Sequence, residues 1–312
     1  MWKSLTRSLA GKLILFFTAV SLVAVIMIGY LSFTNAEQFI FAFETEKLAA
    51  ARNDRIRELT DFFDETIFDV QFLSSLAEVR EALASIQGDQ SQKDGGPGPS
   101  AGAGSELYRK MEARTGNTLD RWLKTYETKN GFHDVILVTA DGHVPYTVKK
   151  ESELGEILGT GKLKDTGLGR AWNTVMKMGK MTFTDFGIYG PSAVPAAFVG
   201  APVQNQDGRV LGVLVVRIGM EAINGIFSQT QELGKTAEAY IVGEDHLMRS
   251  NSRFEKDSLL RLKVDTEAVK GAFSGRSETR IIRDYRNTFV LSSFCKVGIR
   301  EKKELGADFE WA

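Results

Sequence analysis

The stretch FHDVILVTADGHVPYTV, residues Phe132–Val148, decides the fold, because a second stretch of the same kind follows later in the chain. AEAYIVGEDHLMRSNS, at Ala237–Ser252, also has the pattern of a strand, a polar turn and a second strand. In the first stretch, apolar residues run into Asp141–Gly142, a dipeptide typical of a tight hairpin turn. The sequence therefore predicts one small α/β module that is present twice.

Each module has further strands after a helical segment. In the first module they are expected at Met181–Tyr189, Pro195–Asn205 and Arg209–Gly219. In the second they are expected at Ser277–Tyr285 and Thr288–Ile299, after a helix at Asp265–Phe273. The strand that would match Arg209–Gly219 only begins at Phe309–Ala312, so we expect the second sheet to lack its last strand.

The N-terminal region has the features of a membrane anchor. Leu13–Phe33 has no charged residue, and its length of about 21 residues is enough to cross a bilayer as a helix. Lys3, Arg7 and Lys12 precede it, and positive residues stay on the cytoplasmic side. A cleaved signal peptide is disfavoured because it would need a shorter apolar core. The sequence predicts a single-pass membrane protein, with residues 34–312 outside the cytoplasm.

A long amphipathic helix is expected after the anchor. Its apolar residues recur at three- and four-residue steps, at Ile56, Leu59, Phe63, Ile67, Val70, Leu73 and Leu76. Such a face would pack on the chain's own sheet or form the contact of a homodimer, and both uses could hold along different parts of the helix. Residues 87–105 are rich in Gly, Ser and Pro and predict a flexible loop, and Glu106–Asn130 is helical again.

These observations predict an α+β chain with a transmembrane helix, a long amphipathic helix and two tandem antiparallel sheets with flanking helices. The expected parts are a cytoplasmic N-terminus at 1–12, the membrane helix at 13–33, the helical stalk at 34–130, the first module at 131–219 and the second module at 220–312.

Four segments of the chain resemble the double Cache (dCache) sensor domain of bacterial transmembrane receptors, chiefly methyl-accepting chemotaxis proteins. They are AYIVGEDHLMRSNSRF (Ala239–Phe254), DTEAVKGAFSG (Asp265–Gly275), DYRNTFVLSSFCKVGI (Asp284–Ile299) and FTDFGIYGPSAVPAAFVGAPV (Phe183–Val203). The resemblance covers about residues 10 to 312. It implies that the first module is membrane-distal and holds a ligand, and that the second is membrane-proximal.

Two departures limit what the resemblance implies. Family members continue through a second membrane helix into a cytoplasmic output domain, which this sequence does not contain. The amino-acid-sensing branch carries an Arg-x-Trp-Tyr run, to which Arg170–Asn173 is only superficially similar. Amino-acid binding is therefore not inferred from the family.

No catalytic or cofactor motif is visible in the sequence. His133, His143 and His246 lie far apart and do not have the spacing of a metal site. Cys295, the single cysteine, has the pattern of a buried strand residue rather than a nucleophile. The net charge of −1 gives no reason to expect a nucleic-acid partner. We expect neither an enzyme nor a resident metal or cofactor.

A sensor needs a pocket with a few polar anchors. The candidates near the first sheet are Trp122, Tyr126, Tyr146, Asp185 and Tyr189. Asp185 would accept a hydrogen bond from a ligand amine, and the aromatic faces would contact a cationic group. These candidates also have structural explanations. Trp122 and Tyr126 lie one helical turn apart, as residues packed in a core often do. Asp185 would be a loop carboxylate whose hydrogen bonds are made within the protein.

The leading functional hypothesis is the extracytoplasmic sensor of a dimeric chemoreceptor that binds a small molecule or a periplasmic binding protein. The alternatives are the sensor region of a histidine kinase or of a nucleotide or diguanylate cyclase, and a membrane-anchored binding protein without an output domain.

Overall fold

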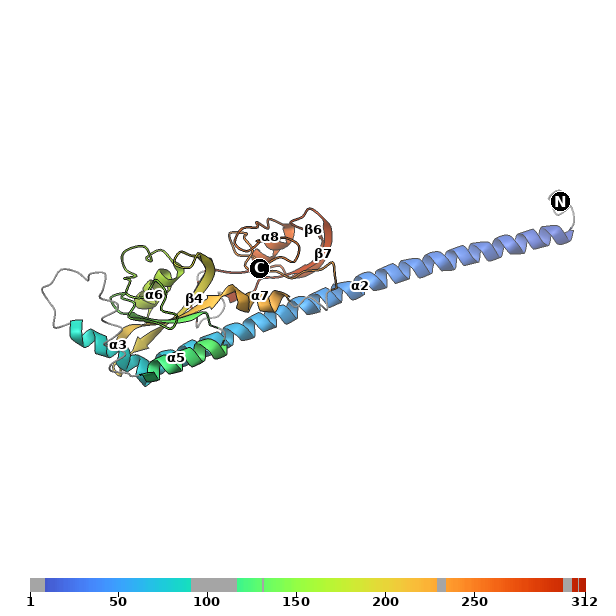
Figure 1. Ribbon diagram of the computed structural model, residues 1–312. Coiled ribbons are helices and arrows are strands. Elements are labelled where there is room, and N and C mark those ends of the chain that lie inside the picture. The colour runs from blue at the N-terminus through green and yellow to red at the C-terminus, as the bar shows by residue number, and fades with distance from the viewer. Residues whose placement is uncertain (1–8, 91–116, 131, 229–233, 300–304, 308) are drawn as a thin grey trace. The chain divides into compact units, whose positions relative to one another are not determined.

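The computed structural model describes residues 9–90, 117–130, 132–228, 234–299, 305–307 and 309–312. The chain divides into an N-terminal part, Met1–Ala50, and a compact part, Ala51–Ala312. Helix α2 (Leu9–Ser75) begins in the first and ends in the second (Figure 1). The predicted N-terminal segment 1–12, the loop 87–105 and the helix 106–130 lie partly outside the described residues.

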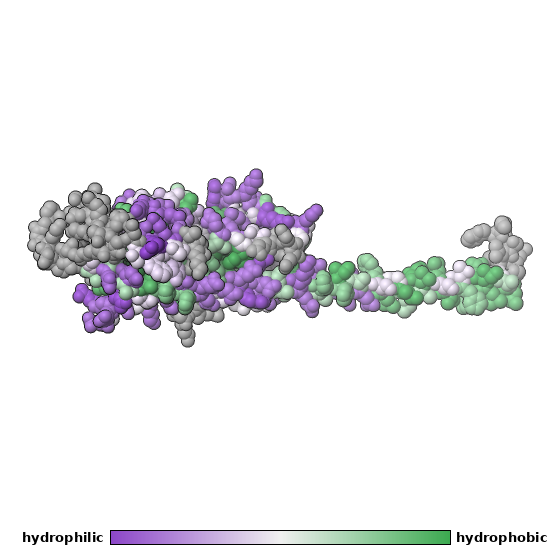
Figure 2. Space-filling model, turned by 60° about the horizontal axis from the view of Figure 1, so that its bottom comes forward, coloured by the Kyte–Doolittle hydropathy of each residue, from purple (hydrophilic) through white to green (hydrophobic). Residues whose placement is uncertain are grey.

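The N-terminal part of α2 is apolar and exposed. An 18-residue window with a mean hydropathy of 2.5 contains no buried residue, so the helix is long and apolar enough to cross a membrane. Figure 2 shows the hydrophobic surface of this segment and the largely hydrophilic surface of the compact part. The Thr18 hydroxyl donates to the carbonyl of Ile14 at 2.7 Å, which satisfies it without water, as an apolar environment requires.

In the compact part, the end of α2 and two further helices form one layer. Helix α3 (Ala77–Gln90) follows α2 after a single non-helical residue, and α5 spans Asn117–Asn130. Leu59, Phe63, Val70 and Leu73 of α2 are buried, so the amphipathic face predicted for this stretch is confirmed. This face packs on the chain's own sheet, which is the first of the two uses that its pattern allows.

The first module contains a five-stranded antiparallel sheet with the order β2-β1-β5-β4-β3. Its strands are β1 (Asp134–Thr139), β2 (Tyr146–Thr147), β3 (Thr182–Tyr189), β4 (Val194–Gln204) and β5 (Val210–Gly219). All of them lie close to their predicted bounds. Strand β5 is central, with Leu214 opposite Leu137 of β1 and Val216 opposite Val199 of β4.

Both faces of this sheet are buried. On the face that we call the helix side, Val135 and Leu137 pack against α2, α3 and α5. On the opposite face, the α6 side, Ile136 and Val138 pack against helix α6 (Gly167–Met178) and the loop before it. Successive strand residues point to opposite faces, so β1 and β5 must be apolar almost throughout.

The second module repeats this order of neighbours with shorter strands. Its elements are helix α7 (Met220–Ser228), helix α8 (Glu267–Phe273), β6 (Glu278–Arg283) and β7 (Phe289–Phe294). Val242 exchanges backbone hydrogen bonds with Ala312 at 2.8 and 2.9 Å, and Val297 donates to the Trp311 carbonyl at 2.8 Å. Trp311 and Ala312 thus lie where β5 lies in the first module, between the segments equivalent to β1 and β4.

The first turn of helix α6 lies very close to the backbone of the preceding loop. The Thr166 side chain caps the helix by accepting from the Gly169 amide. A Cβ atom on Gly169 would lie 2.3 Å from the Leu163 carbonyl oxygen and 2.4 Å from that of Lys164. The two glycines at this helix start, Gly167 and Gly169, are therefore explained by packing.

We expect Gly169→Ala to lower the free energy of unfolding by about 1–3 kcal/mol, because the loop backbone must move to admit the methyl group. Gly225→Ala is the matched control, since this glycine lies on α7 and a Cβ atom added to it would meet nothing within 4 Å. The control should be neutral or stabilised by up to about 1 kcal/mol. Denaturant unfolding of the full chain in detergent micelles would measure both, and equal effects would contradict the packing argument.

Candidate functional site

Four polar side chains are buried together on the α6 side of the five-stranded sheet. We call Asp134, Glu153, Tyr189 and Arg217 the polar cluster; none of them is more than 1% exposed. Asp134 on β1 lies opposite Arg217 on β5, and Tyr189 is the last residue of β3. Glu153 belongs to the loop that connects β2 to α6 and covers this face. A single face of the sheet thus gathers charged groups from four segments.

Arg217 organises one half of the cluster. Its Nη1 donates to Glu151 Oε2 at 2.9 Å and its Nη2 to Ser192 Oγ at 2.5 Å. Its guanidinium carbon lies 4.8 Å from the centre of the Tyr189 ring. These contacts fasten the covering loop and the turn between β3 and β4 to the central strand.

The other half of the cluster has polar atoms without partners among the described residues. The unpartnered buried atoms are Asp134 Oδ2, both carboxylate oxygens of Glu153, the Tyr189 hydroxyl and Arg217 Nε. Asp134 Oδ1, by contrast, accepts from the Val135 amide at 2.8 Å and from the Lys149 amide at 3.1 Å. A buried polar group without a partner costs about 1–3 kcal/mol, so this arrangement favours a state in which something else supplies the missing hydrogen bonds.

Burial also changes the protonation of these groups. Loss of solvent raises the pKa of Asp134 to about 7, and the nearby Glu153 carboxylate adds to the effect against the hydrogen bonds from the backbone. Burial likewise raises the pKa of Glu153, with Glu151 contributing in the same direction. The pKa of Tyr189 is raised by burial and then by the charge of Glu153. The carboxyl group of Asp134 therefore titrates near neutral pH.

The five residues that the sequence suggested lie in different places. Tyr189 belongs to the polar cluster. Tyr146 is buried on the helix side, where its hydroxyl donates to Asp120 at 2.9 Å. Tyr126 packs against the same core, with its ring centre 5.7 Å from that of Phe72, while Trp122 on the same helix is 44% exposed.

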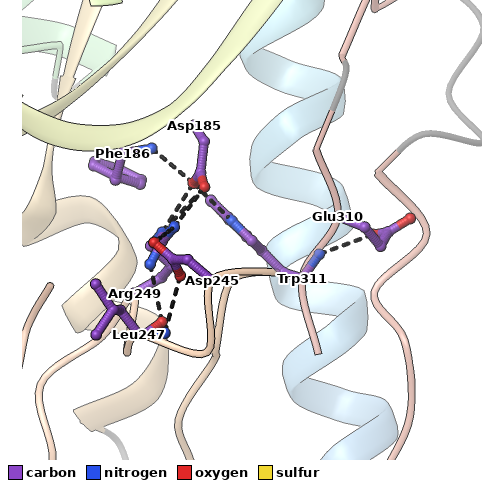
Figure 3. A network of polar contacts seen from close by, with 7 residues as sticks. All are labelled: Asp185, Phe186, Asp245, Leu247, Arg249, Glu310 and Trp311. Carbon is purple, nitrogen blue, oxygen red and sulfur yellow. Dashed lines mark hydrogen bonds and ion pairs between the residues drawn. The ribbon is translucent and has the colours of Figure 1, made fainter. Parts of the chain in front are cut away.

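The fifth residue, Asp185, binds the second module. Its carboxylate pairs with Arg249, with contacts of 3.0 and 3.2 Å to Nε and 2.7 Å to Nη2, and accepts from Trp311 Nε1 at 2.9 Å (Figure 3). Arg249 also reaches Asp245 at 3.0 Å and the Leu247 carbonyl at 2.9 Å. Both oxygens of this carboxylate accept hydrogen bonds from protein groups, which is the satisfied alternative considered for it from the sequence.

A β-bulge explains why Asp185 can face the second module. The pairing of β3 with β4 shifts register between Thr184 and Gly187. The extra residue lets both Asp185 and Phe186 reach Trp311, whose ring stacks on Phe186 at 5.9 Å. Beyond the bulge, Tyr189 returns to the α6 side.

Sequence reasoning missed Asp134, Glu153 and Arg217. A signal for Arg217 was present, because it is the charged residue in the otherwise apolar run VLGVLVVRI, Val210–Ile218. A charge in a strand that is buried on both faces must have partners inside the protein. Glu153 had no such signal, since its loop shows no periodicity.

Comparison with known proteins gives structural resemblances only. No protein-family model matches the chain, and no curated protein matches it. Similar solved structures include the ligand-binding domain of the Pseudomonas aeruginosa amino acid chemoreceptor PctC with GABA, at 13% identity and a TM-score of 0.49 over 86% of this chain and 96% of that one. The Pseudomonas fluorescens chemoreceptor CtaA with L-alanine matches at 11% identity and 0.49, over 82% and 89%. The sensor domain of the V. cholerae histidine kinase DctB matches at 12% identity and 0.49, over 91% and 96%.

We expect Asp134→Asn to change how stability depends on pH. Between the ordinary value of 3.8 and about 7, folded Asp134 keeps a proton that the unfolded chain has lost, so wild-type stability falls as pH rises through this window. The slope is at most about 1.4 kcal/mol per pH unit. The variant lacks this contribution, so its stability relative to wild type should increase from pH 5 to pH 7.

The control for the pH experiment is Asp207→Asn, in the exposed turn between β4 and β5. Its stability should follow the wild type in parallel across the same window. Melting curves of the full chain at several pH values would measure all three proteins, and a parallel curve for Asp134→Asn would contradict the raised pKa.

We expect Asp185→Asn to lower the free energy of unfolding by about 3 kcal/mol, because it leaves the buried Arg249 short of negative charge. Asp245→Asn is the control: the same arginine loses a partner whose side chain is 49% exposed, and the cost should stay below about 1 kcal/mol. Denaturant unfolding would compare them. Equal losses would show that the two carboxylates hold Arg249 equally.

Proposed function

We propose that this chain is the sensor region of a bacterial transmembrane receptor and that its first module binds a small molecule at the polar cluster. The observation that carries the proposal is the set of unpartnered atoms on Asp134, Glu153 and Tyr189, all buried on one face of the sheet. Natural proteins rarely leave such atoms unpaired, and ligand sites are among the places where they do.

The surroundings of the cluster suit a receptor. The covering loop carries Glu151 and Glu153 and is held to the sheet by the ion pair with Arg217, so a ligand that competes for this pair would change the position of the loop. A ligand shifts a conformational equilibrium only through contacts that differ between the two states. The ion pair between the loop and the sheet is a contact that would differ between the free and the ligand-bound state.

The membrane anchor, the dimer contact and the output complete the proposed receptor. The apolar helix supports a membrane anchor at residues 13–33, with the two modules at 131–219 and 220–312 outside the cytoplasm. We place a homodimer contact on the long helix, where Phe68 and Phe72 are 68% and 39% exposed. The sequence resemblance supports chemotaxis as the output of the receptor.

Two tyrosines of the first module allow a matched test, because each is 1% exposed and they lie on opposite sides of the sheet. Tyr189→Phe removes an unpartnered hydroxyl, so it should stabilise the free protein by about 1 kcal/mol and weaken ligand binding. Tyr146→Phe removes a hydroxyl that is bonded to Asp120, so it should destabilise the free protein by about 1 kcal/mol and leave binding unchanged.

The measurement is a thermal-shift screen of the full chain against amino acids, organic acids, amines and purines, repeated with both variants. A stabilising compound that depends on Tyr189 and not on Tyr146 supports the polar cluster. The reverse dependence would move the site to the helix side, where Trp122, Tyr126 and Tyr146 lie, and the absence of any stabilising compound would count against small-molecule sensing.

A further inference from the structure

We propose that the polar cluster binds an organic cation, an alkylammonium compound with several N–H donors, in preference to a carboxylate or a zwitterion. This inference rests on the proposed ligand-binding function and adds the chemical class of the ligand. It is carried by the balance of charges and of hydrogen-bonding groups on the α6 side of the sheet.

The charges in the cluster do not balance. Asp134, Glu151 and Glu153 are three carboxyl groups around the single guanidinium of Arg217. Arg217 is already paired with Glu151 at 2.9 Å and gives its other terminal nitrogen to Ser192. Asp134 and Glu153 are therefore left without a cationic side chain bonded to them.

The hydrogen-bonding groups point to the same class. Three carboxylate oxygens are unpartnered, one on Asp134 and two on Glu153, and the Tyr189 hydroxyl can also accept. The unpartnered atoms that can donate are Arg217 Nε, the Tyr189 hydroxyl and Nδ1 of His133, which acts on Glu153. An ammonium group offers three donors and a positive charge, which matches this excess of acceptors, whereas a carboxylate would add acceptors where they already predominate.

In the free protein, protons partly take the place of the cation. Burial raises the pKa of Asp134 to about 7 and that of Glu153 above its ordinary value, so these groups retain protons at a pH where exposed carboxyls do not. The other titratable groups that act on them are His133, Lys149, Glu151, Tyr189 and Arg217. A bound ammonium group would favour the ionised carboxylates, so binding should release protons.

The experiment uses calorimetric titration of the full chain in lipid nanodiscs with three probes of comparable length and different charge. They are 1,4-diaminobutane, 4-aminobutanoate and succinate. We expect 1,4-diaminobutane to bind about tenfold or more tightly than the other two, since the loss of one charge-assisted hydrogen bond weakens affinity by about tenfold or more. Its binding heat should differ between buffers of different ionisation enthalpy, as proton release requires.

Variants assign the binding to the cluster. Glu153→Gln should weaken the binding of 1,4-diaminobutane by about tenfold or more, because one carboxylate is lost. Glu156→Gln is the control, since this carboxylate lies in the same loop and pairs with Lys162 at 3.0 Å instead; its affinity should equal that of the wild type. Asp134→Asn serves as a second cluster variant if Glu153→Gln does not fold, and it should weaken binding in the same direction.

Three results would overturn the inference. Tighter binding of 4-aminobutanoate or succinate would reject the cationic class, and if that binding weakened in Tyr189→Phe the proposed ligand-binding function would still stand. No binding of any probe would also reject the cationic class, whatever the wider screen finds. Binding of 1,4-diaminobutane that neither cluster variant changes would show that the cation binds elsewhere.

Discussion

The structure of the first module depends on one charge in a strand that is buried on both faces. Strand β5 is the centre of the sheet, and Arg217 is its only charged residue. A guanidinium in such a position is tolerated only with close polar partners, because burying it alone would cost more than the fold gains elsewhere. Glu151 and Ser192 supply these partners from two loops. The loop that is held in this way also brings Glu153 over the sheet, so the composition of the site follows from this one side chain.

The fold could be predicted from the sequence to a greater extent than the site. Strands such as β1 and β5 are recognisable because burial on both faces requires an unbroken apolar run, and the helix face of α2 because its apolar residues recur with the helical period. The pairing of Glu151 with Arg217 joins residues 66 positions apart and leaves no periodic trace. Tyr189 was identified by its residue type, whereas Tyr146, equally aromatic and equally buried, lies on the other side of the sheet. The two tyrosines face opposite sides of the sheet because of strand register, which cannot be read from the residue type.

Asp134 and Asp185 show how the same side chain serves opposite purposes in one module. Asp185 has Arg249 and the Trp311 indole around its carboxylate, so both of its oxygens accept hydrogen bonds from protein groups and it holds two parts of the chain together. Asp134 has two backbone donors on one oxygen and none on the other. The first arrangement is complete within the protein, while the second is completed only by a proton, a water molecule or a ligand. Whether all its hydrogen-bonding atoms have partners therefore distinguishes a structural contact from a candidate binding site more clearly than burial does.

Strand β3 contains both Asp185, whose carboxylate is hydrogen-bonded within the protein, and Tyr189, whose hydroxyl is unpartnered. The two residues are four positions apart, and the bulge includes Asp185. An extended strand rises about 3.3 Å per residue and hardly stretches, so Tyr189 and Asp185 are about 13 Å apart along a nearly rigid connection. The bulge also sets the two side chains on opposite faces, and removing one residue there would turn Tyr189 away from the α6 side. Pairing with β4 on both sides of the bulge fixes the position of both residues. One edge strand thus carries a buried hydroxyl of the polar cluster and the carboxylate that accepts from the Trp311 indole.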